Sequence, residues 1–240
     1  MLLLCMPVSV LYAQNTKPLY QLPGKITASA DSSSESDVFL VGSDSGLYKI
    51  TSSNNVIPLW TEARVDQIVK VRMPEFIGNS IAGSKDAWFF RTQKGLYYSE
   101  DLKTFTARDK GLPILKIKKY DGNKTWMEEQ IQELKDFCVN PINNMEMVTA
   151  TKDAVFYSAD GGNSWKSLGS MSKTTPGVKA VAVVTLEGET VVFMTHPIFG
   201  LSYIMPYRNK AMWTDVEDGF IKMQSLSSPD EIADILPVVR

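Results

Sequence analysis

The sequence predicts an all-β protein in which four-stranded sheets recur along the chain as the blades of a β-propeller. Three observations favour this fold class: a strand–turn–strand pattern recurs four times, an aromatic residue follows each copy, and apolar residues do not recur at helical spacing over a useful length. Radial repetition of such units leaves only short, protected sheet edges. A chain of 240 residues is long enough to bury a core of this kind.

Each copy of the pattern consists of a strand, a tight polar turn and a second strand that opens with a small residue. The copies are VFLVGSDSGLYKI, WFFRTQKGLYYS, MVTATKDAVFYS and VFMTHPIFGLSYI, and their second strands open with Gly46, Gly95, Ala154 and Gly200. These anchors recur roughly every 45 to 60 residues. The aromatic residues that follow are Trp60, Phe105, Trp165 and Trp213. Apolar runs such as QIVKV and ELKDFCV precede the copies and predict the innermost strand of each unit.

Residues 115–130, LKIKKYDGNKTWMEEQ, predict an additional hairpin between the second and third copies. Strand-forming residues lie on both sides of the turn at Asp121, Gly122, Asn123 and Lys124. Two interpretations are open. The hairpin is either an insertion that elongates one blade or a compressed repeat that has lost strands.

The residues before the first copy predict export. The apolar run in MLLLCMPVSVLYAQN is too short to span a bilayer and suits a signal peptide over residues 1–14, with a buried N-terminal strand as the alternative. Cys5 would leave with the signal, so the exported chain would keep Cys138 alone and form no disulfide. We expect an N-terminal segment with a Ser-rich loop over residues 15–36 and the propeller over residues 37–240. The expected location is periplasmic or extracellular.

The stretch YSADGGNSWKSLG contains a corner in which an acid, glycines, a hydroxyl and an indole follow one another. The Asp160 carboxylate can accept hydrogen bonds from backbone N–H groups a few residues on, and Gly162 permits a positive φ. Trp165 can then cover the hairpin. The segments from Asp121 to Trp126 and from Ser99 to Phe105 are weaker copies. A structural turn is therefore favoured over a binding or catalytic loop.

This corner resembles the Asp-box, or bacterial neuraminidase repeat, of sialidases and other propellers. The first copy matches the motif throughout, the second departs from it at Lys119 and Asn123, and the third is one residue shorter. The resemblance implies a non-catalytic, sialidase-like propeller similar to the photosystem II assembly factors, with the motif at the outer rim. The residues that carry it are Ser158, Asp160, Gly162, Ser164 and Trp165, then Asp121, Thr125 and Trp126, then Ser99, Asp101 and Phe105.

The sequence offers no metal or cofactor site. One aspartate and one asparagine in the corner cannot supply the six to eight oxygens that calcium prefers. His196 is the single histidine and is expected in a turn, while Cys138 lies in an apolar run, so neither a zinc site nor a Cys/His dyad is expected. Glu128 and Glu129 are neighbours on a strand and point to opposite faces, so a solvated hairpin edge is expected there.

The enzyme alternative is a glycoside hydrolase of sialidase type. The sialidase family carries an Arg-Ile-Pro element, which VRMP at residues 71–74 resembles loosely. On that alternative Arg72, Arg108 and Arg208 would form a carboxylate-binding cluster beside Tyr203 or Tyr207 as nucleophile. Prolines 141 and 229 also follow apolar runs, so Pro74 is equally explained as the end of an innermost strand. We expect no catalytic residue.

The number of blades is open between four and five. The C-terminal stretch SLSSPDEIADILPVV either begins a fifth unit or forms a short helix with Ser228 as its N-cap. The first interpretation gives an incomplete propeller, which self-association could close, and the second gives a small complete propeller or an open array.

The functional prediction is an exported, non-enzymatic propeller that serves as a protein-binding or assembly scaffold. Its formal net charge of −2 gives no electrostatic footprint for nucleic acid, and no segment reaches the length of a membrane span. The expected partner is another protein or a glycan. The alternative is a sialidase-like glycoside hydrolase or glycan-binding propeller.

Overall fold

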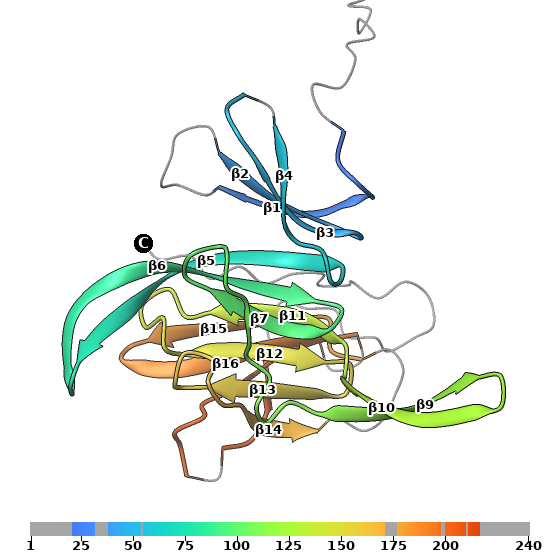
Figure 1. Cartoon of the computed structure of the whole chain (residues 1–240). Helices are drawn as coiled ribbons and strands as arrows, with labels where there is room; N and C mark the ends of the chain where they lie inside the picture. Colours follow the sequence, from blue (N-terminus) through green and yellow to red (C-terminus); the bar gives the residue numbers. More distant parts are fainter. Residues whose placement is uncertain are drawn as a thin grey trace, which may run out of the picture.

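The protein is described by a computed structural model that covers residues 21–31, 38–53, 55–170, 177–197, 200–209 and 211–216 (Figure 1). The expected signal peptide at residues 1–14 and the expected fifth unit or helix around Ser228 lie outside the described residues. The described residues contain no helix of the length and apolar character needed to cross a bilayer.

Strands account for all the regular structure in the described part of the chain. They form four four-stranded antiparallel sheets and one two-stranded sheet. The first sheet contains β1 (Ile26–Asp31), β2 (Phe39–Ser43), β3 (Gly46–Ile50) and β4 (Val56–Trp60), and the second contains β5 (Val65–Ile77), β6 (Ser80–Thr92), β7 (Gly95–Ser99) and β8 (Thr106–Ala107). The third contains β11 (Leu134–Val139), β12 (Met147–Thr151), β13 (Ala154–Ser158) and β14 (Lys166–Ser170), and the fourth contains β15 (Ala180–Leu186), β16 (Glu189–His196), β17 (Gly200–Ile204) and β18 (Thr214–Asp215).

The four predicted repeats correspond to the four larger sheets. The predicted anchors Gly46, Gly95, Ala154 and Gly200 are the first residues of β3, β7, β13 and β17. In the first three turns a hydroxyl at the end of the preceding strand holds the corner. Thr92, for example, donates from Oγ1 to the carbonyl of Gly95 over 2.9 Å and accepts from the backbone N–H of Lys94 over 3.1 Å. Ser43 and Thr151 take the same position in their own sheets.

The predicted Ser-rich loop is wrong over residues 26–31, because this segment forms β1. It pairs with β2 and lies beside β5 of the second sheet. Ala28 and Ala30 are half-buried and alternate with exposed residues, and Thr27 donates from Oγ1 to the carbonyl of Val65. Small side chains therefore let β1 approach its neighbour closely, although they give little apolar signal in the sequence.

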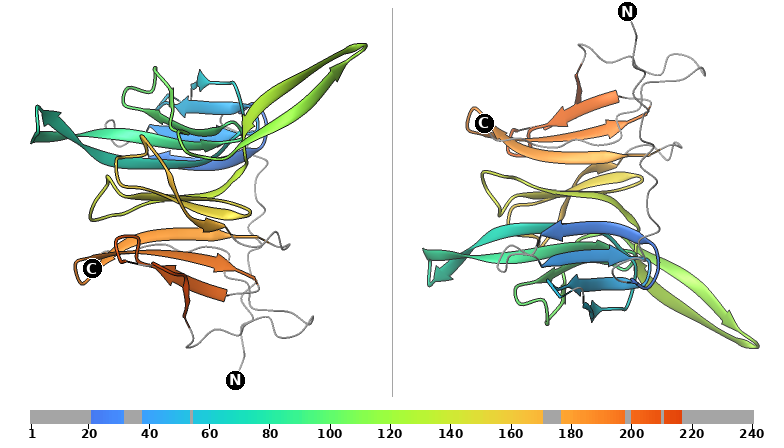
Figure 2. Two further views of the ribbon diagram at one scale, coloured as in Figure 1. Left: turned by 90° about the horizontal axis from the view of Figure 1, so that it is seen from below. Right: turned by 90° about the horizontal axis from the view of Figure 1, so that it is seen from above.

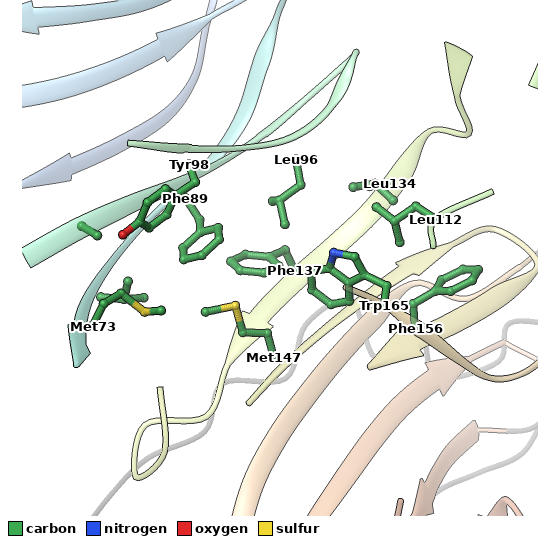
Figure 3. Packing of buried hydrophobic residues seen from close by; sticks show 12 residues of the cluster. Met73, Phe89, Leu96, Tyr98, Leu112, Leu134, Phe137, Met147, Phe156 and Trp165 are labelled. Atoms are coloured by element: carbon green, nitrogen blue, oxygen red, sulfur yellow. The ribbon is translucent and has the colours of Figure 1, made fainter. Parts of the chain in front are cut away.

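The sheets stack in chain order, with their first strands β1, β5, β11 and β15 side by side. Figure 2 shows the first and last sheets at opposite ends of this stack. The described residues thus form an open series of propeller-like sheets. A buried apolar cluster fills each of the three spaces between successive sheets. In the middle cluster, shown in Figure 3, the ring of Phe137 lies 5.3 Å from that of Phe89 and 6.4 Å from that of Trp165.

Two hairpins extend beyond this stack on opposite sides (Figure 1). One is the outer part of β5 and β6, since β6 pairs with β7 only from Trp88 to Thr92. Pro74 lies inside β5, opposite Ser84, and so does not end the innermost strand as the sequence indicated. The other hairpin consists of β9 (Ile114–Asp121) and β10 (Lys124–Ile131), which form a separate two-stranded sheet.

Candidate functional site

The corner from Ser158 to Trp165 is held by a compact set of hydrogen bonds around one carboxylate. Asp160 accepts from the Ser158 hydroxyl over 2.7 Å and from the backbone N–H of Ser164 over 2.9 Å. The Ser164 hydroxyl donates to the second carboxylate oxygen of Asp160 over 2.5 Å. Burial raises the pKa of Asp160, but the hydrogen bonds from Ser164 and Ser158 outweigh it and hold the pKa below its ordinary value. Gly162 has a φ of +78°.

The indole of this corner reaches the preceding sheet. Trp165 is buried, and its Nε1 donates to the main-chain carbonyl of Arg108, beyond the end of β8, over 2.8 Å. Trp213 repeats the arrangement one sheet later, since its Nε1 donates to the carbonyl of Leu168 on β14 over 3.1 Å. These indoles fasten successive sheets together at their outer strands. The corner therefore serves the architecture.

The copy of the corner from Ser99 to Phe105 has its own carboxylate cradle. Asp101 accepts from the backbone N–H groups of Lys103 and Thr104, each over 2.8 Å, and from the hydroxyls of Thr104 and Ser99. The hydrogen bonds from the Thr104 and Lys103 backbone lower the pKa of Asp101 to about 2. Phe105 takes the place of the indole and packs with its ring 5.5 Å from that of Phe90.

The copy from Asp121 to Trp126 shares the sequence pattern of the other two but not their structure. Asp121 ends β9 opposite Lys124, and Thr125 and Trp126 lie within β10. Trp126 is 47% exposed, so it does not cover a hairpin. The serine that donates to Asp160 in the first copy has no counterpart here, where Lys119 stands. This segment is the end of a projecting ribbon.

The three arginines of the enzyme alternative contact three different sets of partners. Arg72 is largely exposed on β5 and lies 3.7 Å from Asp86. The guanidinium of Arg108 lies 4.5 Å above the ring of Tyr98 and donates to Asn163. Arg208 pairs with Glu189 over 2.6 Å.

The two candidate nucleophiles of that alternative lie near the fourth sheet. Tyr203 packs on Phe193, with ring centroids 6.2 Å apart. Tyr207 is largely exposed, yet its hydroxyl lies 2.8 Å from that of Tyr157 and donates to Glu146 over 3.3 Å. Burial, and then the hydrogen bond with Tyr207, raise the pKa of Tyr157.

Glu146 is the centre of a buried polar network that the sequence did not reveal. It is 5% exposed and accepts from Asn140 Nδ2 over 2.7 Å and from the Thr190 hydroxyl over 2.9 Å. Asn140 also donates to Thr185 over 2.9 Å. In the part of the chain that the structure describes, no basic side chain forms an ion pair with Glu146. The network joins the loop after β11 to the β15–β16 hairpin, and it leaves little of the carboxylate open to a substrate.

The other residues considered for chemistry have structural surroundings. His196 was expected in a turn, but it is the last residue of β16 and is 2% exposed, because strand pairing with Gly200 continues through it. Cys138 is half-buried on β11. Glu129 lies 3.3 Å from Lys116 and Glu128 lies 3.6 Å from Lys119 on the β9–β10 ribbon. No group of three or more His, Cys, Asp or Glu among the described residues could hold a metal ion.

A cleft of about 520 Å³ lies where the β9–β10 ribbon leaves the second sheet. Tyr97 lines it together with carboxylates, among them Glu62 and Asp109, and with the side chains of Gln93 and Gln130. Burial raises the pKa of Tyr97, and the charges of Glu62 and Asp109 raise it further. The cleft is therefore acidic and has one aromatic wall.

A second cleft of about 500 Å³ lies between β5 and β11. Lys70 and Arg72 line it, but both face Asp86, which lies 2.8 Å from Lys70 Nζ. The pKa of Asp86 is lowered by these cations, chiefly by its hydrogen bond with Lys70. One carboxylate thus offsets part of the charge of the two cations in this cleft.

The most distinctive surface is the β9–β10 ribbon. Five large apolar or aromatic side chains are exposed on it: Ile114, Leu115, Tyr120, Trp126 and Met127. Its strands pair with each other alone among the described residues, so each has a free edge. Tyr120 and Met127 lie on one face of the ribbon and Trp126 on the other. An isolated two-stranded hairpin is marginally stable in water, so exposed aromatic and apolar side chains on one are typical of an interaction site.

Comparison with known proteins gives a partial structural likeness. No protein-family model matches the chain, and neither does any curated protein. Solved structures that are similar include an ancestral GH74 enzyme, at 17% identity and a TM-score of 0.46, and the GH74 enzyme of Niastella koreensis, at 13% identity and a TM-score of 0.34. Each match covers 75% of this chain but only 22% and 36% of those structures, respectively. The propeller-like fold of this protein therefore rests on its own four-stranded sheets.

Proposed function

We propose that this protein is an exported, non-enzymatic scaffold that binds another protein through the β9–β10 ribbon. The observation that carries the proposal is the ribbon itself, which projects from the stack with Trp126, Tyr120 and Met127 exposed and with two free strand edges. Aromatic residues and methionine are enriched at protein interfaces, and an unpaired strand edge can accept a strand from a partner. The separate contacts of the three arginines favour binding over catalysis.

The proposal is tested by site-specific photocrosslinking in the native envelope. A photoreactive phenylalanine analogue at position 126 is compared with the same analogue at Met212, which is exposed in the segment between β17 and β18. We expect a reproducible crosslinked protein from position 126 that is absent from position 212 and is competed by the unlabelled chain. The same products from both positions, or none from position 126, would contradict the proposal.

Glycan binding is the second candidate, and the cleft beside Tyr97 favours it. An aromatic ring next to carboxylate and amide acceptors can stack on a sugar ring and accept hydrogen bonds from its hydroxyls. Titration of neutral oligosaccharides into the purified chain tests this, with Asp109→Asn as the variant expected to weaken binding. Hydrolysis of an aryl glycoside by the wild type, lost in Tyr207→Phe, would instead support the enzyme alternative.

A further inference from the structure

The second projecting hairpin differs chemically from the first. Among the described residues, 71–77 of β5 and 80–87 of β6 have no strand partner but each other, so they form a two-stranded extension of the second sheet. Three large apolar residues crowd its tip: Phe76 is 54% exposed, Ile77 is 76% exposed and Ile81 is 69% exposed. The stretch from Phe76 to Ser84, FIGNSIAGS, contains no charged residue.

The apolar side chains leave the tip in both directions. Phe76 pairs with Ile81 on one face of the ribbon, while Ile77 pairs with Ser80 on the other. The apolar residues of the β9–β10 ribbon also lie on both faces, but charged residues stand between them there, whereas this tip has none. A groove on a folded protein would cover one uncharged face of the tip and leave the other in water. A lipid bilayer surrounds an inserted tip on all sides, so it accommodates apolar groups on both faces equally well.

The charges around the tip define how deep it could go. Glu75 and Lys85 flank the uncharged stretch, and Lys85 is held by Glu100 over 2.5 Å. Residues 76 and 77 and the turn extend beyond these two charged residues. At about 3.3 Å per residue, this part of the hairpin is roughly 10 Å long. This matches the 5 to 10 Å depth at which apolar groups lie in the boundary between headgroups and acyl chains.

The backbone of the tip fits the same depth. The ladder between β5 and β6 continues to the pair Ile77 and Ser80, so the backbone groups that face the other strand are hydrogen-bonded. The turn at Gly78 and Asn79 and the outer edges of the two strands present peptide groups to their surroundings. Such groups are costly in the hydrocarbon core but are satisfied by water and headgroups at the interface.

We infer that the tip of the β5–β6 hairpin inserts into the interface of a lipid bilayer and anchors the protein peripherally. The absence of basic residues from the tip indicates a bilayer of electrically neutral headgroups, with no need for anionic lipid. This goes beyond the proposed scaffold function. The two hairpins project from opposite sides, so the β9–β10 ribbon stays in solution while the other tip is inserted.

Flotation with phosphatidylcholine vesicles tests the inference on the purified full chain. The wild type is compared with the triple variant Phe76→Ser, Ile77→Ser, Ile81→Ser. The matched control is Tyr120→Ser, Trp126→Ser, Met127→Ser, which removes apolar groups from the other ribbon. We expect the partition coefficient to fall roughly 100-fold in the tip variant and to stay within about twofold in the control.

Two further arms keep the result specific. Raising the salt concentration from about 0.05 to 0.5 M, or replacing a third of the lipid by phosphatidylglycerol, should leave the partition unchanged. Ile77→Leu should float like the wild type, and Ile77→Asp should not. The inference is overturned if the wild type does not float, if it floats only with anionic lipid or an added envelope protein, or if both triple variants lose binding equally. None of these outcomes bears on crosslinking at position 126.

Discussion

The indole nitrogen of Trp165 lies 2.8 Å from the main-chain carbonyl oxygen of Arg108 and donates a hydrogen bond to it. Arg108 follows the outermost strand of the second sheet, and Trp165 precedes that of the third. The same indole fills the space beside Phe137 in the middle cluster. One side chain thus provides both apolar burial and a polar link between two sheets.

Replacing Trp165 should separate these two contributions. Trp165→Phe keeps most of the apolar volume but leaves the Arg108 carbonyl without its donor, so we expect a loss of about 1–3 kcal/mol in the free energy of unfolding. Trp165→Ala also creates a cavity and should cost about 3–5 kcal/mol. Urea denaturation measures both. The exposed Trp126→Phe is the control and should stay within about 0.5 kcal/mol.

Gly111 should tolerate alanine much less well than Gly78. Both have positive φ, +95° and +61°, so each substitution carries a backbone strain of about 1–2 kcal/mol. A Cβ at Gly111 would lie 2.3 Å from the Trp165 carbonyl oxygen, whereas one at Gly78 meets nothing within 4 Å. We expect Gly111→Ala to lose a further ~1–3 kcal/mol through overpacking. Equal losses in the two variants, compared by thermal unfolding, would contradict this explanation.

The carboxylate of Asp101 should make stability depend on pH in the acid range. Its pKa is lowered to about 2 from an ordinary 3.8 by the hydrogen bonds that the Thr104 and Lys103 backbone donate. A lowered folded pKa means that the stabilisation is complete above about pH 4 and is lost as the pH falls towards 2. Melting temperatures of the wild type and Asp101→Asn, measured between about pH 2 and 5, should converge as the pH falls. A constant difference across that range would argue against the cradle.

Replacing the buried carboxylate of Glu146 by an amide should lower the free energy of unfolding. In Glu146→Gln one carboxylate oxygen becomes an N–H donor: at the Oε2 position it would face the Nδ2 donor of Asn140, and at the Oε1 position the Thr190 or Tyr207 hydroxyl would have to accept in place of donating. Either arrangement replaces hydrogen bonds to a charged acceptor by weaker ones to a neutral amide. We expect a loss of about 1–3 kcal/mol. The exposed Glu75→Gln should change the free energy of unfolding by less than about 0.5 kcal/mol. Chemical denaturation of both variants at pH 7 measures the difference.

The strand pattern could be predicted where the information is local. Gly46 and Gly95 have φ values of +134° and +120°. Each turn needs a residue that tolerates a positive φ, and the glycine that meets this need is visible in the sequence. The strand β1 could not be found in the same way, because its alanines gain their burial only from pairing with β2 and lying beside β5. A pattern of small residues does not reveal a neighbour that comes later in the chain.

The β9–β10 ribbon that carries the candidate binding surface could be predicted as a hairpin, because it is continuous in the sequence. The Glu146 network could not, because its parts come from distant segments. Asn140, Glu146 and Thr190 meet through the packing of the third sheet on the fourth, and no spacing in the sequence indicates this. The segment from Asp121 to Trp126 shows the opposite case, in which the sequence pattern is present but the structure is not. It lacks the serine that donates a hydrogen bond to the carboxylate. The uncharged stretch beginning at Phe76 is visible in the sequence. Its exposure is not, because it depends on how far β5 and β6 extend beyond the part of β6 that pairs with β7.

The direction of the indole contacts bears on how the chain is made. Trp165 and Trp213 each reach back to a carbonyl of the sheet that precedes their own. A chain that emerges from the ribosome therefore offers every new sheet a docking surface that is already complete. Assembly can advance one sheet at a time from the amino-terminal side, and only the newest face is exposed to aggregation while synthesis continues.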